Sequence, residues 1–162
     1  MICIAVVYSL WSNLNELKTE IKILSDEKKV VKQENEALNK KIIQSEKDFK
    51  IISDTNFIKI DLIGSPDSPS SKAVVYWNPD SKKVYLKIES LPVPPSYKDY
   101  HLWAVDIKGN SIDAGILIAD PADKNLKQMK DVEIANSFLI TLEDKKAVRI
   151  PDMINLYASG KL

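Results

Sequence analysis

The sequence predicts a mainly β protein, an antiparallel β-sandwich preceded by a long N-terminal coiled-coil α-helix. Three observations predict this fold. No glycine or proline lies between Met1 and Gly64, so no helix-breaking residue interrupts this part of the chain. Apolar residues recur there with helical spacing up to about residue 52. Beyond it, short runs alternate apolar and polar residues between turn sequences, which is typical of strands.

The composition argues against several classes of function. The chain has 162 residues, enough for one moderate domain and an extension. Its 23 basic and 23 acidic side chains cancel, which argues against a nucleic-acid binder. The single cysteine, Cys3, and the single histidine, His101, cannot form an internal disulfide or a Cys/His metal cluster. We therefore predict no cofactor, no metal and no nucleic-acid partner.

The first residues, 2–11, are almost wholly apolar. A membrane span needs about 20 such residues, and the run lacks the features of a signal peptide. It is either the C-terminal part of a membrane helix whose beginning is outside this sequence or the apolar start of a soluble coiled coil. We favour the first, because Tyr8 and Trp11 then lie where interfacial aromatic residues are expected. Residues 1–12 are accordingly predicted to end a membrane helix.

Residues 13–53 carry a heptad pattern. With Leu14 at position a and Leu17 at d, nine of 12 core positions are apolar, which predicts a coiled coil. A single amphipathic helix packed on the β domain is the alternative, but a helix of about 60 Å would overhang that domain. The predicted coiled-coil seam, in which Ser45 occupies the one remaining d position, consists of Leu14, Leu17, Ile21, Leu24, Lys28, Val31, Asn35, Leu38, Ile42, Phe49 and Ile52.

The polar a positions predict the number and direction of the helices. Asn35 favours a parallel dimer, because two such amides can pair across the seam, and Lys28 disfavours trimers and tetramers. In a parallel dimer each g position faces the following e position of the partner. Glu27 then faces Lys32, and Lys41 likewise faces an acidic residue, so both pairs attract. We predict a parallel homodimer.

Residues 54–162 are predicted to form the β-sandwich, because seven short alternating runs are separated by turn sequences. Residues 119–133 are too polar for an assignment. The predicted strands are 57–64, 73–77, 84–89, the two strands of a hairpin over 100–117, 135–143 and 154–160.

The hairpin over residues 100–117 is the most informative segment of the β domain. His101 and Trp103 share one face of its first strand. Gly109 supplies a turn residue that tolerates positive φ. Gly115 interrupts the second strand, where a bulge or a close backbone approach is expected.

Several short motifs follow one another in order along the β domain. They are Leu91-Pro92, the Tyr-x-Leu-Trp formed by Tyr100, Leu102 and Trp103, the turn at Gly109, the step at Gly115, and the Thr-x-Glu of Thr141 and Glu143. Together they resemble the C-terminal domain of anti-sigma-K factors. One departure from the family pattern follows Thr-x-Glu, where residues 144–151 lack the usual glycine pair, so we expect a different backbone path there.

The resemblance implies the extracytoplasmic regulatory half of a membrane-anchored bacterial anti-sigma factor. Such a protein holds an extracytoplasmic-function sigma factor inactive at the inner membrane, and regulated proteolysis releases it. This chain would lie on the extracytoplasmic, periplasmic side. The sigma factor would be bound only through a cytoplasmic domain that this sequence does not contain.

The alternative function is an envelope ligand- or carbohydrate-binding module on a coiled-coil stalk. Tyr100, Trp77 and Trp103 would then form a stacking platform, although we expect both tryptophans in the core. We do not predict an enzyme, because no nucleophile motif occurs.

Isolated polar residues raise two further possible functions, a carboxylate site and a general base. Asp106, Asp113 and Glu143 could in principle form a carboxylate site, and His101 could act as a base. Acids at turns and strand ends are more often solvated, and we expect His101 to be structural.

Overall fold

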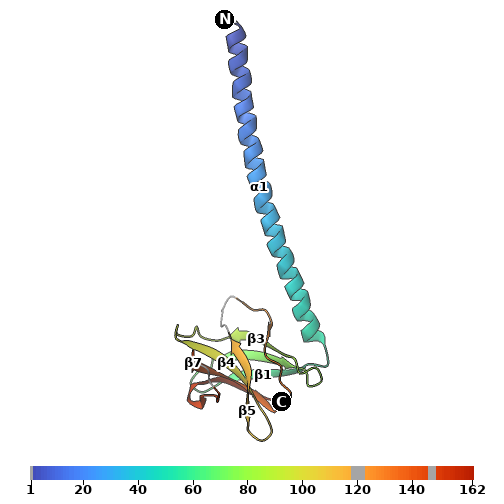
Figure 1. Cartoon of the computed structure of the whole chain (residues 1–162), viewed down its shortest axis with the longest axis vertical. Helices are drawn as coiled ribbons and strands as arrows, with labels where there is room; N and C mark the ends of the chain where they lie inside the picture. The colour runs from blue at the N-terminus through green and yellow to red at the C-terminus, as the bar shows by residue number, and fades with distance from the viewer. Residues whose placement is uncertain (1, 118–122, 146–148) are drawn as a thin grey trace. The chain divides into compact units, whose positions relative to one another are not determined.

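The computed structural model describes residues 2–117, 123–145 and 149–162. The chain forms two compact units, Met1–Gln44 and Ser45–Leu162. The first is helical, and the second contains the last turns of the same helix and an antiparallel sheet (Figure 1). A long N-terminal helix followed by an antiparallel β domain is the order that the sequence predicts.

Helix α1 (Ile2–Ser53) is continuous over 52 residues. Its sequence is rich in Lys, Glu, Leu and Ile, most of which lose little side-chain freedom in a helix. Within the described residues, no helix has an apolar stretch long enough to cross a membrane, and this includes the apolar start of α1.

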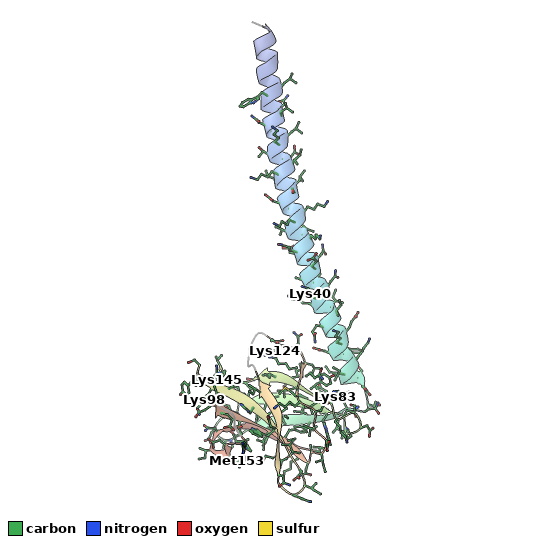
Figure 2. All side chains as sticks on the ribbon, in the orientation of Figure 1. Lys40, Lys83, Lys98, Lys124, Lys145 and Met153 are labelled. Carbon is green, nitrogen blue, oxygen red and sulfur yellow. The ribbon has the colours of Figure 1, made fainter. Side chains whose placement is uncertain are left out.

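The predicted coiled-coil seam is exposed along α1. Side chains project on every side of the helix (Figure 2). The apolar seam residues range from 43% exposed at Ile52 to 69% exposed at Phe49. The polar seam residues Lys28 and Asn35 are exposed as well. A single chain thus leaves an apolar stripe in water, and its pairing with a second helix stays a prediction.

The sheet contains every strand that the sequence predicts and one more. The additional strand is short and lies within residues 119–133, the polar stretch to which the sequence pattern assigned no structure. The strands are β1 (Ile58–Gly64), β2 (Lys72–Trp77), β3 (Val84–Ser90), β4 (Lys98–Val105), β5 (Ser111–Leu117), β6 (Lys127–Gln128), β7 (Ser137–Asp144) and β8 (Leu156–Lys161), with the 3-10 helix η1 (Met153–Asn155) before β8.

The structure differs from the predicted sandwich, because the described strands form one sheet in the order β5-β4-β7-β8-β1-β2-β3-β6. β8 pairs with β7 along most of its length, but with β1 through two residue pairs, at Ile63 and Gly64. The sheet curls strongly into a half-barrel (Figure 1). Its two halves therefore face each other, and Trp77 on β2 meets Phe138 on β7 with ring centroids 6.2 Å apart.

The main core lies on the inner face of the curled sheet. Alternate residues of the long strands point into it, as the period-two pattern predicts. Its fully buried members include Val75, Leu86, Leu102, Phe138 and Ile140. The outer face is also covered in two places, over β2 and β3 and over β4 and β7.

Candidate functional site at the helix–sheet junction

The end of α1 packs against the outer face of β2 and β3. A small apolar cluster separate from the main core forms there. This junction cluster consists of Ile51, Phe57, Val74, Tyr76, Tyr85 and Leu126. Phe57 meets Tyr85 edge to face, with ring centroids 5.7 Å apart. The cluster joins the last helical turn to the sheet and to the segment that begins at Leu126.

A short turn connects α1 to β1, and Asp54 organises it. The Asp54 amide donates to the carbonyl of Ile51 at 3.3 Å, and its own carbonyl accepts from the amide of Phe57 at 3.1 Å. The Asp54 carboxylate also accepts from the backbone and side-chain nitrogens of Asn56, at 2.9 and 2.8 Å. Such an Asx turn restricts the backbone. Few free torsions therefore separate the helix end from the sheet.

A polar contact reinforces the junction. The amide of Leu126 donates to Oδ2 of Asp48 at 3.0 Å. Asp48 and Ile51 are three residues apart and so lie on one side of α1. Phe49 and Ile52, which belong to the predicted coiled-coil seam, remain 69% and 43% exposed. The sheet thus holds the helix end by a side other than the seam.

A second covered patch, on the outer face of β4 and β7, contains a buried polar network. Nε1 of Trp103 donates to the hydroxyl of Thr141 at 2.9 Å. That hydroxyl donates to Oε1 of Glu143 at 2.5 Å, and the amide of Asp152 donates to the same oxygen at 2.8 Å. Glu143 is only 5% exposed. Because a buried carboxylate needs donors, the network explains why Trp and Thr-x-Glu occur together.

Residues 149–155 cover this network. Pro151 is buried, and the carboxylate of Asp152 accepts from the amide of Ile154 at 3.0 Å, which caps η1. The other side of the segment faces solvent. Ile154 is 88% exposed and Met153, labelled in Figure 2, is 56% exposed.

The Leu-Pro connection is fixed to β4 by Tyr100. The Tyr100 hydroxyl donates to the carbonyl of Pro92 at 3.1 Å, and Leu91 is buried beside it. The ring of Tyr100 is fully buried and meets Tyr157 edge to face at 5.0 Å. Burial raises the pKa of the Tyr100 hydroxyl, and the nearby Tyr157 raises it further. The hydroxyl therefore stays protonated and able to donate.

The hairpin turn forms as predicted. Gly109 has a φ of +86°, and its amide donates to the carbonyl of Asp106 at 3.1 Å. The side chain and the amide of Asn110 both donate to the Asp106 carboxylate, and these hydrogen bonds lower the pKa of Asp106. The Asp106 carboxylate therefore stabilises the turn.

The predicted bulge at Gly115 is also confirmed. The register of β4 and β5 shifts between Leu102 and Trp103, opposite this glycine, whose φ is +117°. A Cβ atom there would lie 3.2 Å from Cε of Met129 and 3.6 Å from Cγ of Lys130. Glycine alone fits this conformation and this close approach.

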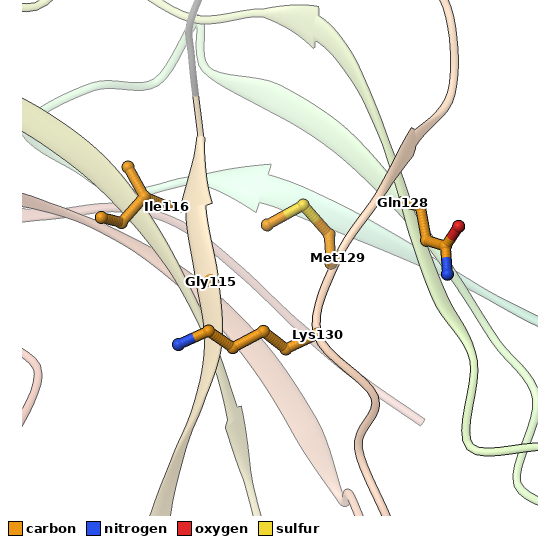
Figure 3. A pocket seen from close by; sticks show the side chains of 5 residues that line it. All are labelled: Gly115, Ile116, Gln128, Met129 and Lys130. Atoms are coloured by element: carbon orange, nitrogen blue, oxygen red, sulfur yellow. The ribbon is translucent and has the colours of Figure 1, made fainter.

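A shallow groove lies beside the bulge. Its lining residues are Gly115 and Ile116 on β5 and Gln128, Met129 and Lys130 across from it. Figure 3 shows the side chains of Met129 and Lys130 extending toward β5 at Gly115. The groove has a volume of about 460 Å³. Among the described residues, its lining contains no acid or histidine, and its one charged group, the Lys130 amine, is paired with Asp113.

The three acids considered as a carboxylate site have separate partners. Asp106 closes the hairpin turn, Asp113 pairs with Nζ of Lys130 at 2.5 Å, and Glu143 belongs to the Trp103 network. In the described parts of the chain, no group of His, Cys, Asp and Glu side chains is placed to hold a metal ion.

The candidate aromatic platform is buried. Trp77 is 5% exposed, and Trp103 and Tyr100 are fully buried, so these rings cannot stack on a sugar. Both tryptophans lie in the interior, as expected. His101 is 5% exposed and stacks on Trp103 with ring centroids 5.9 Å apart, which is a structural position.

The sequence did not single out the residues of the junction, and Asp48, Ile51 and Leu126 show why. Ile51 occupies heptad position c, outside the seam, and an apolar residue there is a weak sign of a second contact. Leu126 lies in the polar stretch that received no assignment, so no pattern could have placed it opposite Asp48.

The comparisons with known proteins bear on the whole chain. Neither the comparison with curated proteins nor that with solved structures found a match. The family model described as "Anti-sigma-K factor rskA, C-terminal" matches residues 4–151. The match includes α1 from Ile4 onward, the junction and the motif residues from Leu91 to Glu143. The chain therefore belongs to the family of anti-sigma-K factor rskA C-terminal domains.

Proposed function

We propose that this chain is the extracytoplasmic regulatory half of a membrane-anchored anti-sigma factor. It would lie on the periplasmic side of the inner membrane, with residues 1–12 as the end of a membrane helix. The sigma factor would bind a domain that this sequence does not contain, and regulated proteolysis would release it. The family match over residues 4–151 carries this proposal.

In this proposal, residues 13–53 pair with a second copy of the chain as a parallel homodimer. The apolar stripe of the seam is exposed in the single chain, and a second copy presents the same stripe. Neighbouring charges favour the parallel arrangement, because Glu27 would face Lys32 and Lys41 would face Glu46. The junction leaves Phe49 uncovered, so pairing can continue to the base of the helix.

The junction supplies the physical means of regulation. A change in the sheet domain reaches the last helical turn through the Asp54 turn and through the contact of Leu126 with Asp48. A paired rod then carries the change toward the membrane. In this way the sheet domain would control access of a protease to the chain near or within the bilayer.

Two experiments test the proposal. Sedimentation equilibrium of the chain at tens of micromolar should give a dimer, and Leu24→Glu with Leu38→Glu should give a monomer. The matched control changes two outward positions of the same helix, Gln33→Glu and Lys40→Glu, and should leave the dimer intact. A monomeric parent chain would refute the pairing.

The regulatory role is tested in cells with the full-length protein. Leu24→Pro with Leu38→Pro breaks the rod, and should change both signal-dependent cleavage and the activity of a sigma-dependent reporter. Unchanged cleavage and reporter activity would refute the coupling. A full-length protein that affects no sigma-dependent promoter would refute the proposed role itself.

A further inference from the structure

One extended segment, residues 126–132, contacts the helix end, the edge of β3 and the edge of β5. We call it the strap. On the β3 side it pairs through β6, and the amides of Met129 and Val132 donate to the carbonyls of Val84 and Lys82, each at 2.9 Å. Nε1 of Trp77 also donates to the carbonyl of Val132 at 2.9 Å. The strap is therefore firmly attached to β3.

Its attachment to β5 is weaker. Among the described residues, one backbone hydrogen bond joins the two, from the amide of Lys130 to the carbonyl of Ala114 at 2.9 Å. The ion pair of Lys130 with Asp113 adds to it, but its two side chains are 62% and 37% exposed. Solvent screens such a pair. The groove beside Gly115 lies along this side of the strap (Figure 3).

The strap also joins the two apolar clusters. Met129 and Val132 belong to the main core, whereas Leu126 belongs to the junction cluster. Leu126 also donates to the carboxylate of Asp48 on α1. Four residues of extended chain span about 13 Å, so one short extended segment joins Leu126 to Lys130.

We propose that the strap couples the β5 edge to the end of α1. Opening the contact of Lys130 with β5 would shift the strap and weaken the hold of Leu126 on Asp48. Tightening that contact would hold the helix end more firmly. This coupling lies within one chain, so it depends on neither the dimer nor the sigma factor and goes beyond the proposed function.

Hydrogen exchange of the intact chain tests the coupling. Lys130→Ala removes the ion pair and should raise exchange at the Leu126 amide and over residues 48–53 measurably, by up to about fivefold, which is the most that a partly solvated ion pair can transmit. The matched control is Lys83→Ala, which removes a similar ion pair, with Asp131 at 2.7 Å, from the β3 side of the strap. It should leave residues 48–53 unchanged.

A reciprocal variant separates coupling from general loosening. Asp48→Asn weakens the helix end of the strap and should raise exchange over residues 113–115, because coupling acts in both directions. Amides of the β7–β8 ladder should stay protected in every variant, and Lys130→Arg should restore the parent pattern. A rise confined to the mutated end, or an equal rise over residues 48–53 in Lys83→Ala, would overturn the inference.

Discussion

The indole nitrogen of Trp103 lies 2.9 Å from the hydroxyl oxygen of Thr141, although Trp103 pairs with Leu139 in the ladder of β4 and β7. The contact is therefore diagonal. It uses the hydroxyl twice, as acceptor from Trp103 and as donor to Glu143. One side chain thus satisfies the buried indole N–H and supplies one of the two donors to the Glu143 carboxylate, the other being the Asp152 amide.

Because the Thr141 hydroxyl both accepts and donates a hydrogen bond, we expect its replacement to lower the free energy of unfolding substantially. Thr141→Val keeps the shape but leaves the indole N–H unsatisfied and removes one donor from a buried carboxylate. We expect the free energy of unfolding to fall by about 3 kcal/mol, measured by urea denaturation. Ser137→Ala on the same strand is the control and should cost under about 0.5 kcal/mol. Equal losses would contradict the network.

The junction predicts that two apolar residues of the same helical turn act differently. Ile51→Ala should lower the free energy of unfolding of the sheet domain by about 1–2 kcal/mol, because it removes part of the junction cluster. Phe49→Ala should leave that stability unchanged and weaken self-association instead, since Phe49 is 69% exposed. Denaturation and sedimentation of both variants separate the two roles. Identical behaviour would show that the helix end has one contact surface.

Acidity should weaken the attachment of the strap to β5. Partial burial alone would raise the pKa of Asp113, but hydrogen bonds from Lys130 and the Gly115 amide, helped by the nearby His101, lower it below its ordinary 3.8. The stabilisation is therefore fully present above pH 3.8 and is lost as the pH falls through the lowered value.

The variant Asp113→Asn makes this measurable. The difference in unfolding free energy between parent and variant should be largest near neutral pH, stay under about 1 kcal/mol because the pair is partly solvated, and shrink toward zero in strong acid. A difference that grows as the pH falls would have the wrong sign and would contradict the pairing.

The two positive-φ glycines should respond differently to alanine. Gly115→Ala imposes backbone strain and also presses on Met129 and Lys130, so we expect a loss of about 2–3 kcal/mol. At Gly109 no atom of the described residues beyond the chain neighbours lies within 4 Å of the added carbon, and the cost should be about 1 kcal/mol. Thermal denaturation of both variants compares them. A larger loss at Gly109 would show that the close approach at Gly115 has no energetic weight.

Local patterns predicted the helix, the hairpin and the long strands, because helical spacing and strand alternation depend on neighbours in sequence. The strap could not be predicted, because it pairs with strands distant in sequence and its own sequence is polar. The arrangement of all the described strands in a single sheet could not be predicted for a similar reason, because the pairs of β1 with β8 at Ile63 and Gly64 join opposite ends of the domain.

The candidate site was only partly predictable. Trp103, Thr141 and Glu143 stood out as motif residues, but no pattern shows that one hydroxyl links them. The buried Pro151 and the Asp152 cap could not be foreseen either, because a covering segment whose only described regular structure is the three-residue η1 is too short to leave a periodic signal.

The position of β8 has a consequence for how the domain is made. β8 is last in chain order among the described strands, yet it lies between β7 and β1 and is the link between the two halves of the sheet. During synthesis the earlier strands can form hairpins, but the two halves of the sheet can be joined only after residues 156–161 are made. The domain should therefore mature in one late step, and a chain cut short before β8 would expose two unpaired edges to quality-control proteases.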